Sequence, residues 1–362
     1  MYKVKHKYPF FIFIFLLFCL YNNDLFIEND SVSEALIVGR LLESKKNGIL
    51  SHSGLTGYVT DSVHIDDYNY NARLQFEIMD SIKNSESYPV FKTYDSHNGG
   101  QAILYGVFET ISPLRLTTNI KILKIINIGL LSFVFTLLAL WTKRNFGIIP
   151  CLTLLLFIAA SSWIRNFSSS LWWNLWVLYV PFIVGLLYLE KQTIITYKQE
   201  KKLLFFLYLS IVFKCCMTGF EYILTTLVVG FIPILYYYIQ LKKTFLELIR
   251  ISISYMLIFI GAVLTSLLLL VFQIKQIKGS FSLGVQHVLD TFSRRTADVV
   301  IQGKTAEISS NQYIQILLKY INGNMFSWSN NKVPFLLMLL IIFCCCGVLL
   351  LTNLSKNKEI LI

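Results

Sequence analysis

The stretch Leu203–Ile239, LLFFLYLSIVFKCCMTGFEYILTTLVVGFIPILYYYI, decides the class of fold. Only Lys214 and Glu221 carry a charge in its 37 residues. As a single helix it would be about 55 Å long, whereas the hydrocarbon core of a bilayer is about 30 Å thick. Thr218-Gly219 lies near its middle, and glycine is typical of a turn between helices. The stretch therefore predicts two membrane spans joined by a tight hairpin.

The rest of the chain has the same apolar character. Of its 362 residues, 55% are hydrophobic and 15% are charged, whereas soluble domains carry about 25% charged residues. This composition excludes a soluble multidomain enzyme and a disordered chain. We predict an all-α polytopic membrane protein with eight spans. They are Tyr8–Ile27, Ile125–Trp141, Gly147–Ile164, Leu171–Leu189, Leu203–Met217, Phe220–Ile239, Ile251–Gln273 and Val333–Asn353.

Lysine and arginine in the short connections predict the orientation, because they collect on the cytosolic side. With the N-terminus inside, the inner segments are 1–7, 142–146, 190–202, 241–250 and 354–362, which hold 14 Lys/Arg and 4 Asp/Glu. Most of the net charge of +11 is then a topology signal, so we expect no nucleic-acid partner. We predict a multi-pass protein of the cell (inner) membrane with both termini cytosolic.

Five regions follow from this topology: an N-terminal anchor helix (1–27), a first outer loop (28–118), spans two to seven (119–273), a second outer loop (274–332), and the last span with its tail (333–362). No small-residue cleavage site follows the first apolar run, so we expect a retained anchor rather than a signal peptide. The inner connections are too short for a nucleotide-binding domain, so any activated substrate would arrive on a lipid. All seven cysteines lie in apolar runs, where we expect filler rather than disulfides or metal ligands.

The first outer loop opens with a predicted helix. Val32, Ala35, Leu36 and Gly39 follow helical spacing, and we expect this helix to lie on a surface. Ser31 with Glu34 forms a capping-box pattern, and Gly48 is a plausible stop. Asp30 and Glu34 would then do no more than start a helix. The other interpretation is that a carboxylate at this point takes a proton from a hydroxyl that attacks a lipid-linked donor.

These residues resemble a pattern in membrane glycosyltransferases of the GT-C fold, which use polyprenyl-phosphate sugars. In that family an N-in first span is followed by an acidic motif and a surface helix, a pattern that Asp30, Ala35, Arg40, Leu42 and Gly48 resemble. The resemblance implies that Asp30 is the catalytic base. Ser31 stands where a second acid would be, so Glu28 or Glu34 would take its place.

The segment Tyr94–Gln101 is the second candidate site in this loop. Tyr94, Asp95, His97 and Gln101 surround two glycines that would let the backbone approach a ligand, and such polar groups suit sugar hydroxyls. A simple polar turn explains the same residues equally well. We expect no cofactor; a divalent metal at His52, His64, Asp66 and Asp67 is the minor alternative.

The second outer loop is basic and predicts two amphipathic helices, one around Leu283–Phe292 and one around Tyr313–Ile321. Arg294 and Arg295 would hold a polyprenyl phosphate, or would attract anionic lipid headgroups. Lys214 and Glu221 are functional candidates because charges within spans are costly. The plainer interpretation is that Lys214 extends to the interface and Glu221 pairs with it.

The leading hypothesis is a glycosyltransferase that moves a sugar from a polyprenyl-phosphate carrier to a glycan or lipid acceptor at the outer face, among membrane lipids. Asp30 would be the base, assisted by Glu28 or Glu34. Arg294, Arg295 and Lys214 would stabilise the leaving phosphate. The alternatives are a flippase or transporter for lipid-linked sugars, a polymerase of lipid-linked polysaccharide units, and a membrane scaffold without catalytic activity.

Overall fold

The structure is a computed structural model that describes residues 7–21, 31–61, 64, 67–80, 90–296, 324–328 and 331–334. The chain divides into two compact units, Met1–Ala159 with Ile164–Thr291, and Ala160–Trp163 with Phe292–Ile362. Each unit is described by itself. In the second unit, β3 (Asn324–Trp328) pairs antiparallel with β4 (Asn331–Pro334).

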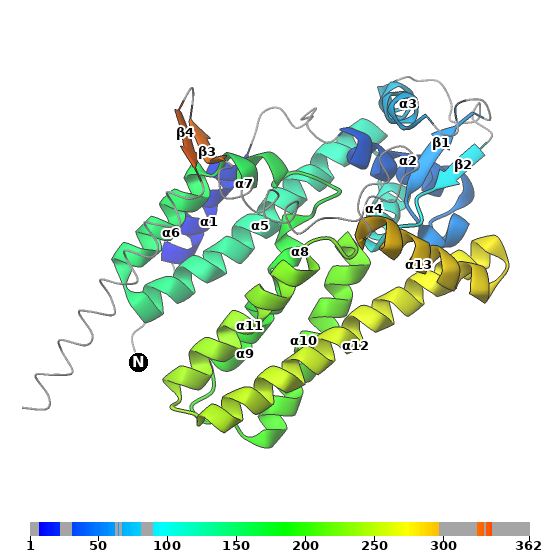
Figure 1. Cartoon of the computed structure of the whole chain (residues 1–362). Coiled ribbons are helices and arrows are strands. Elements are labelled where there is room, and N and C mark those ends of the chain that lie inside the picture. The colour runs from blue at the N-terminus through cyan, green and yellow to red at the C-terminus, as the bar shows by residue number, and fades with distance from the viewer. Residues whose placement is uncertain are drawn as a thin grey trace, which may run out of the picture. The chain divides into compact units, whose positions relative to one another are not determined.

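Helices dominate the described residues (Figure 1). They are α1 (Lys7–Leu20), α2 (Ser31–Asn47), α3 (Tyr68–Asp80), α4 (Gly100–Ile111), α5 (Leu116–Phe146), α6 (Ile148–Ala160), α7 (Ser162–Phe167), α8 (Leu175–Leu178), α9 (Val180–Leu189), α10 (Tyr197–Thr218), α11 (Ile223–Gln240), α12 (Phe245–Lys278) and α13 (Phe281–Thr296). A 3-10 turn, η2 (Ser51–Gly54), follows α2. The strands β1 (Gly57–Thr60) and β2 (Val90–Thr93) form an antiparallel pair. Two short strand pairs thus accompany the helices, and the mostly helical chain fits the predicted all-α class.

Among the described residues, three helices are long and apolar enough to cross a membrane: α5, α11 and α12. Three shorter apolar helices lie in α1, α6 and α9. This composition fits an all-α membrane protein, and large apolar side chains such as Leu156, Leu224 and Leu257 are exposed along the helices. The prediction of eight full spans is not matched. The helices of spans one, three and four are short, and span five falls in α10, whose first turns carry four charged residues.

Helix boundaries differ from the predicted spans mainly at the ends. The break at Thr218-Gly219 is confirmed, since α10 ends at Thr218. In contrast, α5 begins nine residues before the predicted Ile125, and α12 continues to Lys278, into the predicted second loop. β4 covers the first residues of the predicted last span, and the rest of that span lies outside the described residues.

The described residues between 31 and 111 (31–61, 64, 67–80 and 90–111) form a folded domain, here called the loop domain, rather than a loop. Helix α2 begins at Ser31 and ends before Gly48, as predicted. It does not lie on a surface, because α3, β1 and α4 pack around it (Figure 1). Its core contains Ala35, Leu36, Ile37, Val38, Leu41 and Leu42 together with apolar residues of β1, α3, α4 and α5. This extensive apolar burial accounts for the stability of the domain.

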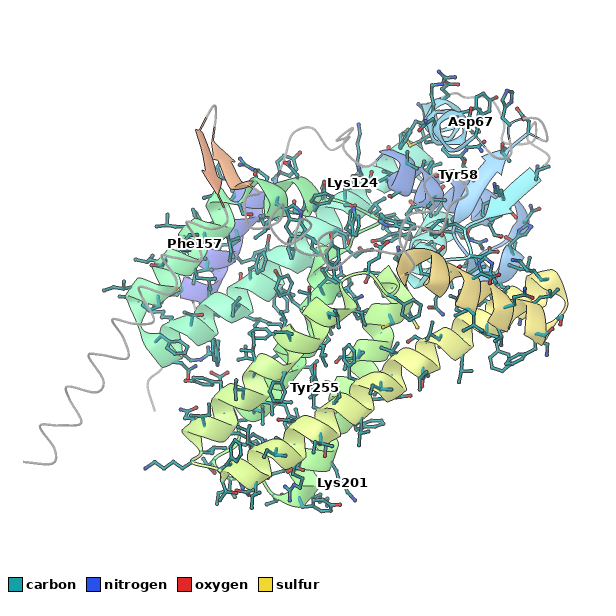
Figure 2. All side chains as sticks on the ribbon, viewed as in Figure 1. Tyr58, Asp67, Lys124, Phe157, Lys201 and Tyr255 are labelled. Atoms are coloured by element: carbon teal, nitrogen blue, oxygen red, sulfur yellow. The ribbon has the colours of Figure 1, made fainter. Side chains whose placement is uncertain are left out.

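The bundle of α5 and α9–α12 has two distinct ends. At one, the predicted inner connections meet: Arg144 binds Glu190 at 2.7 Å, and Arg250 binds Glu200 at 2.7 Å. We call it the basic end. The loop domain packs against the other end, where α10 and α12 contact α4 and η2. Figure 2 shows Lys201 at the basic end, far from Tyr58 and Lys124. Three of the predicted inner connections, 142–146, 190–202 and 241–250, thus lie at the end of the bundle opposite the loop domain.

Candidate functional site

Glu34 lies in a buried ion pair where the loop domain meets α5. Its Oε2 accepts from Lys124 Nζ at 2.5 Å, and its Oε1 accepts from the backbone N–H of Leu171 at 3.2 Å. The side chains of Glu34 and Lys124 are 12% and 2% exposed. Because both carboxylate oxygens are engaged, Glu34 joins α2 to α5 and to the segment before α8, a role that the capping-box interpretation did not include.

A second polar network lies beside this pair and was not predicted. The Tyr105 hydroxyl donates to Asn174 Oδ1 at 2.5 Å and accepts from Asn127 Nδ2 at 3.1 Å. Asn127 Nδ2 also donates to the carbonyl of Ser170 at 3.0 Å. Burial raises the pKa of Tyr105 well above its ordinary value, so the phenol stays protonated. Its members are separated by up to 69 residues, and no local pattern could have identified them.

The segment 94–101 is largely buried rather than open to a ligand. The His97 ring lies 4.4 Å from that of Trp172, and Gln101 donates to the carbonyl of Trp172 at 3.4 Å. Asp95 binds Lys278 at 3.3 Å. The Tyr94 ring packs edge-on against Trp172, 5.6 Å away. The structure thus brings Tyr94, His97 and Gln101 together around Trp172, whereas Asp95 pairs separately with Lys278 of α12 and so joins the loop domain to the bundle.

Glycine is required where this segment approaches α10. A Cβ on Gly100 would lie 2.7 Å from the Cys216 carbonyl oxygen. A Cβ on Gly219, which has φ +65°, would lie 2.7 Å from His97 Cβ. The glycines therefore permit close backbone packing, which is a structural explanation for one of the two glycines noted in 94–101.

Lys214 is fully buried at the end of α10. Its ammonium group donates to the carbonyl of Gly219 at 2.9 Å and to the carbonyl of Glu221. Carbonyls at a helix C-terminus stabilise a cation. The prediction that Lys214 extends to the interface was wrong, because its side chain turns inward to cap α10. Its contact with Glu221 is through the backbone oxygen.

The histidines considered for a metal lie in separate pairs. His52 Nδ1 is 3.1 Å from Glu43 Oε1, and His64 Nδ1 is 3.1 Å from Asp61 Oδ1. Asp67 accepts from the Tyr70 N–H at 2.9 Å and so begins α3. Within the part of the chain that the structure describes, no group of three His, Cys, Asp or Glu side chains could hold a metal ion. Asp66 lies outside the described residues.

Four of the remaining predicted site residues cannot be compared with the structure in full. Glu28 and Asp30 lie outside the described residues. Helix α13 includes Arg294 and Arg295 in its last turn, so the predicted helix is confirmed. For these two arginines the structure describes the backbone alone. No family model, curated protein or solved structure matches the chain.

Proposed function

We propose that this chain is a membrane glycosyltransferase that moves a sugar from a polyprenyl-phosphate carrier to a glycan or lipid acceptor at the outer face of the membrane. In this proposal the N-terminus is cytosolic, the arrangement is GT-C-like, and the shorter helices complete a bundle of about eight membrane segments. The loop domain is then the outer, catalytic part of the protein.

The observation that carries the proposal is the position of the loop domain. It is a folded domain at the end of the bundle opposite the basic end, and by the positive-inside rule the basic end is cytosolic. Nucleotide sugars are not available on the opposite side, so a transferase there uses a donor carried by a membrane lipid. Two of the predicted carboxylates, Glu28 and Asp30, lie between the first span and this domain, and Glu34 lies in the first turn of its first helix.

The distribution of buried charges favours an enzyme over a transporter. Lys124 and Lys214 lie toward the loop-domain end of their helices, and Glu200 lies at the basic end. A transport path would require ionisable groups near mid-span. Among the described residues of α12, no Asp, Glu, Lys or Arg is buried between these ends. The buried Tyr255 of that helix donates its hydroxyl to the carbonyl of Leu227.

The test is a transfer assay with the full chain in membrane vesicles. The probes are a panel of short-chain polyprenyl-phosphate sugars labelled in the sugar, supplied with a membrane extract as the source of acceptor. We expect label to move from the lipid carrier to an acceptor only when the chain is present. Translocation of a fluorescent lipid-linked sugar across proteoliposomes, with no transfer from any probe, would overturn the proposal in favour of a flippase.

A further inference from the structure

A histidine–carboxylate pair in the loop domain has the geometry of a general base. Glu43 Oε1 lies 3.1 Å from His52 Nδ1 and also accepts from Asn47 Nδ2 at 3.0 Å. The Glu43 side chain is 4% exposed, whereas that of His52 is 38% exposed. A buried carboxylate that accepts from Nδ1 fixes the tautomer in which Nε2 carries the free lone pair.

The His52 ring is held in place from two sides. Beside the contact with Glu43, its ring centroid lies 5.0 Å from that of Phe91 on β2. Among the described residues, the hydrogen bonds of the ring involve Nδ1 alone. The arrangement therefore positions an imidazole that is 38% exposed and whose hydrogen bonds leave Nε2 for another partner.

The backbone that carries His52 is strained. His52 has φ 48° and Ser53 has φ 57°, a left-handed conformation that L-residues rarely adopt and that clusters at functional sites. Two helices clamp this turn. From α2, Arg40 donates to the carbonyls of Gly48 at 3.3 Å, Ile49, and Ser51 at 2.6 Å.

From α12, Gln273 Nε2 donates to the Ser53 carbonyl at 2.9 Å, and Ser53 Oγ donates to Gln276 Oε1 at 2.8 Å. Burial lowers the pKa of the Arg40 guanidinium to about 10, so it remains charged at neutral pH. These hydrogen bonds hold the turn in place without the Glu43–His52 contact. The role of that contact is therefore to orient the His52 ring.

The pair also lies at the level where a lipid phosphate would be found. Leu55, next to the turn, packs against Leu270 and Ile274 of α12. Gln273 is the last residue of the predicted span Ile251–Gln273, so the contacts of the turn mark the point at which α12 leaves the predicted membrane core. A hydroxyl acceptor that approaches a polyprenyl-phosphate sugar would meet it at this depth.

We propose that His52 is the general base of the transfer reaction and that Glu43 is its positioning residue; this inference rests on the proposed function. The acceptor hydroxyl oxygen forms a bond to C1 of the sugar while the bond from C1 to the phosphate oxygen breaks. The electron pair of that bond leaves with the polyprenyl phosphate. The hydroxyl proton passes to His52 Nε2 and then to water. This assignment replaces Asp30 as the base.

The experiment compares His52→Asn with His64→Asn in the vesicle transfer assay. Asparagine tolerates the left-handed backbone, and its Nδ2 can still donate to Glu43, so His52→Asn removes the base and keeps the turn. Loss of a general base costs about 10²–10⁴-fold in rate. We expect His52→Asn to lower the transfer rate at least 100-fold. His64 is paired with Asp61 through Nδ1 in the same way and is 43% exposed. The transfer rate of His64→Asn should therefore fall less than 2-fold.

A second variant separates a catalytic role from a structural one. In His52→Gly, added imidazole should restore transfer at least 10-fold, because a free base can occupy the space of the missing ring. Transfer by His52→Asn at more than a third of the wild-type rate would overturn the assignment, as would imidazole having no effect on His52→Gly. If Asp30→Asn alone abolishes transfer, the base is Asp30. If the wild-type chain transfers nothing from the panel, the proposed function itself fails and this inference fails with it.

Discussion

The buried pair between Glu34 and Lys124 gives a prediction whose size follows from its burial. Lys124→Met removes the ammonium group that lies 2.5 Å from the Glu34 carboxylate, which is 12% exposed and still accepts from the Leu171 N–H at 3.2 Å. Removal of one partner from a buried ion pair costs about 3–5 kcal/mol, because the other charge stays desolvated. With a stability of about 5–15 kcal/mol for a folded domain, this is a large fraction of the total.

The assay is equilibrium unfolding of the purified chain in detergent micelles, followed by tryptophan fluorescence. The chain has six tryptophans, so the emission follows the unfolding of the chain as a whole. We expect Lys124→Met and Glu34→Gln each to lower the free energy of unfolding by about 3 kcal/mol or more. The double variant should be less destabilised than the sum of the two single variants by about 2 kcal/mol, since neither buried charge then remains.

A surface pair of the same domain is the control. Arg73 and Glu77 lie 3.4 Å apart on α3, with side chains 72% and 62% exposed. Exposed pairs of this kind contribute about 0.3–0.5 kcal/mol, so Arg73→Met should have little effect. If Lys124→Met were as mild as Arg73→Met, or if the double variant were strictly additive, the buried pair would not be the link that we describe.

Three further outcomes are expected. Tyr105→Phe leaves two buried asparagines without their shared partner and should cost about 1–3 kcal/mol in the same unfolding assay; an unchanged stability would contradict the network. Gly219→Ala forces a left-handed alanine against His97 and should cost about 2–4 kcal/mol, which a thermal-shift comparison would detect. Leu50 is 72% exposed in the loop domain, and Ile194 is 70% exposed at the basic end. If each is replaced by cysteine, the two thiols should react with an impermeant maleimide from opposite sides of sealed vesicles. Labelling of both from one side would refute the proposed topology.

Local sequence signals predicted the parts of the fold that depend on local rules. Helical spacing and Gly48 predicted α2, and the glycine at 219 predicted the hairpin between α10 and α11. The surface position of α2 was wrong although a signal was present. The run from Ala35 to Leu42 is apolar on all faces except Arg40, which is typical of a helix that is buried all round.

The parts that sequence reasoning missed depend on long-range pairing. Glu34 and Lys124 are 90 residues apart, and the two strands of the loop domain are separated by the whole of α3. Nothing in the local pattern around either residue specifies such a partner. The candidate base was missed for a related reason, because the pairing of His52 with Glu43 becomes visible only once the chain turns back after α2.

The length of α12 has a mechanical consequence. Its 34 residues make a rod of about 51 Å, some 20 Å longer than the hydrocarbon core. One end carries the ion pair of Arg250, and the other end holds the strained turn through Gln273 and Gln276. Membrane helices adjust their tilt to the thickness of the bilayer, and a tilt of about 10° from the membrane normal about the basic end would move the far end sideways by about 9 Å and lower it by about 1 Å. Lipid composition is thereby coupled to the lateral position of the turn that carries His52.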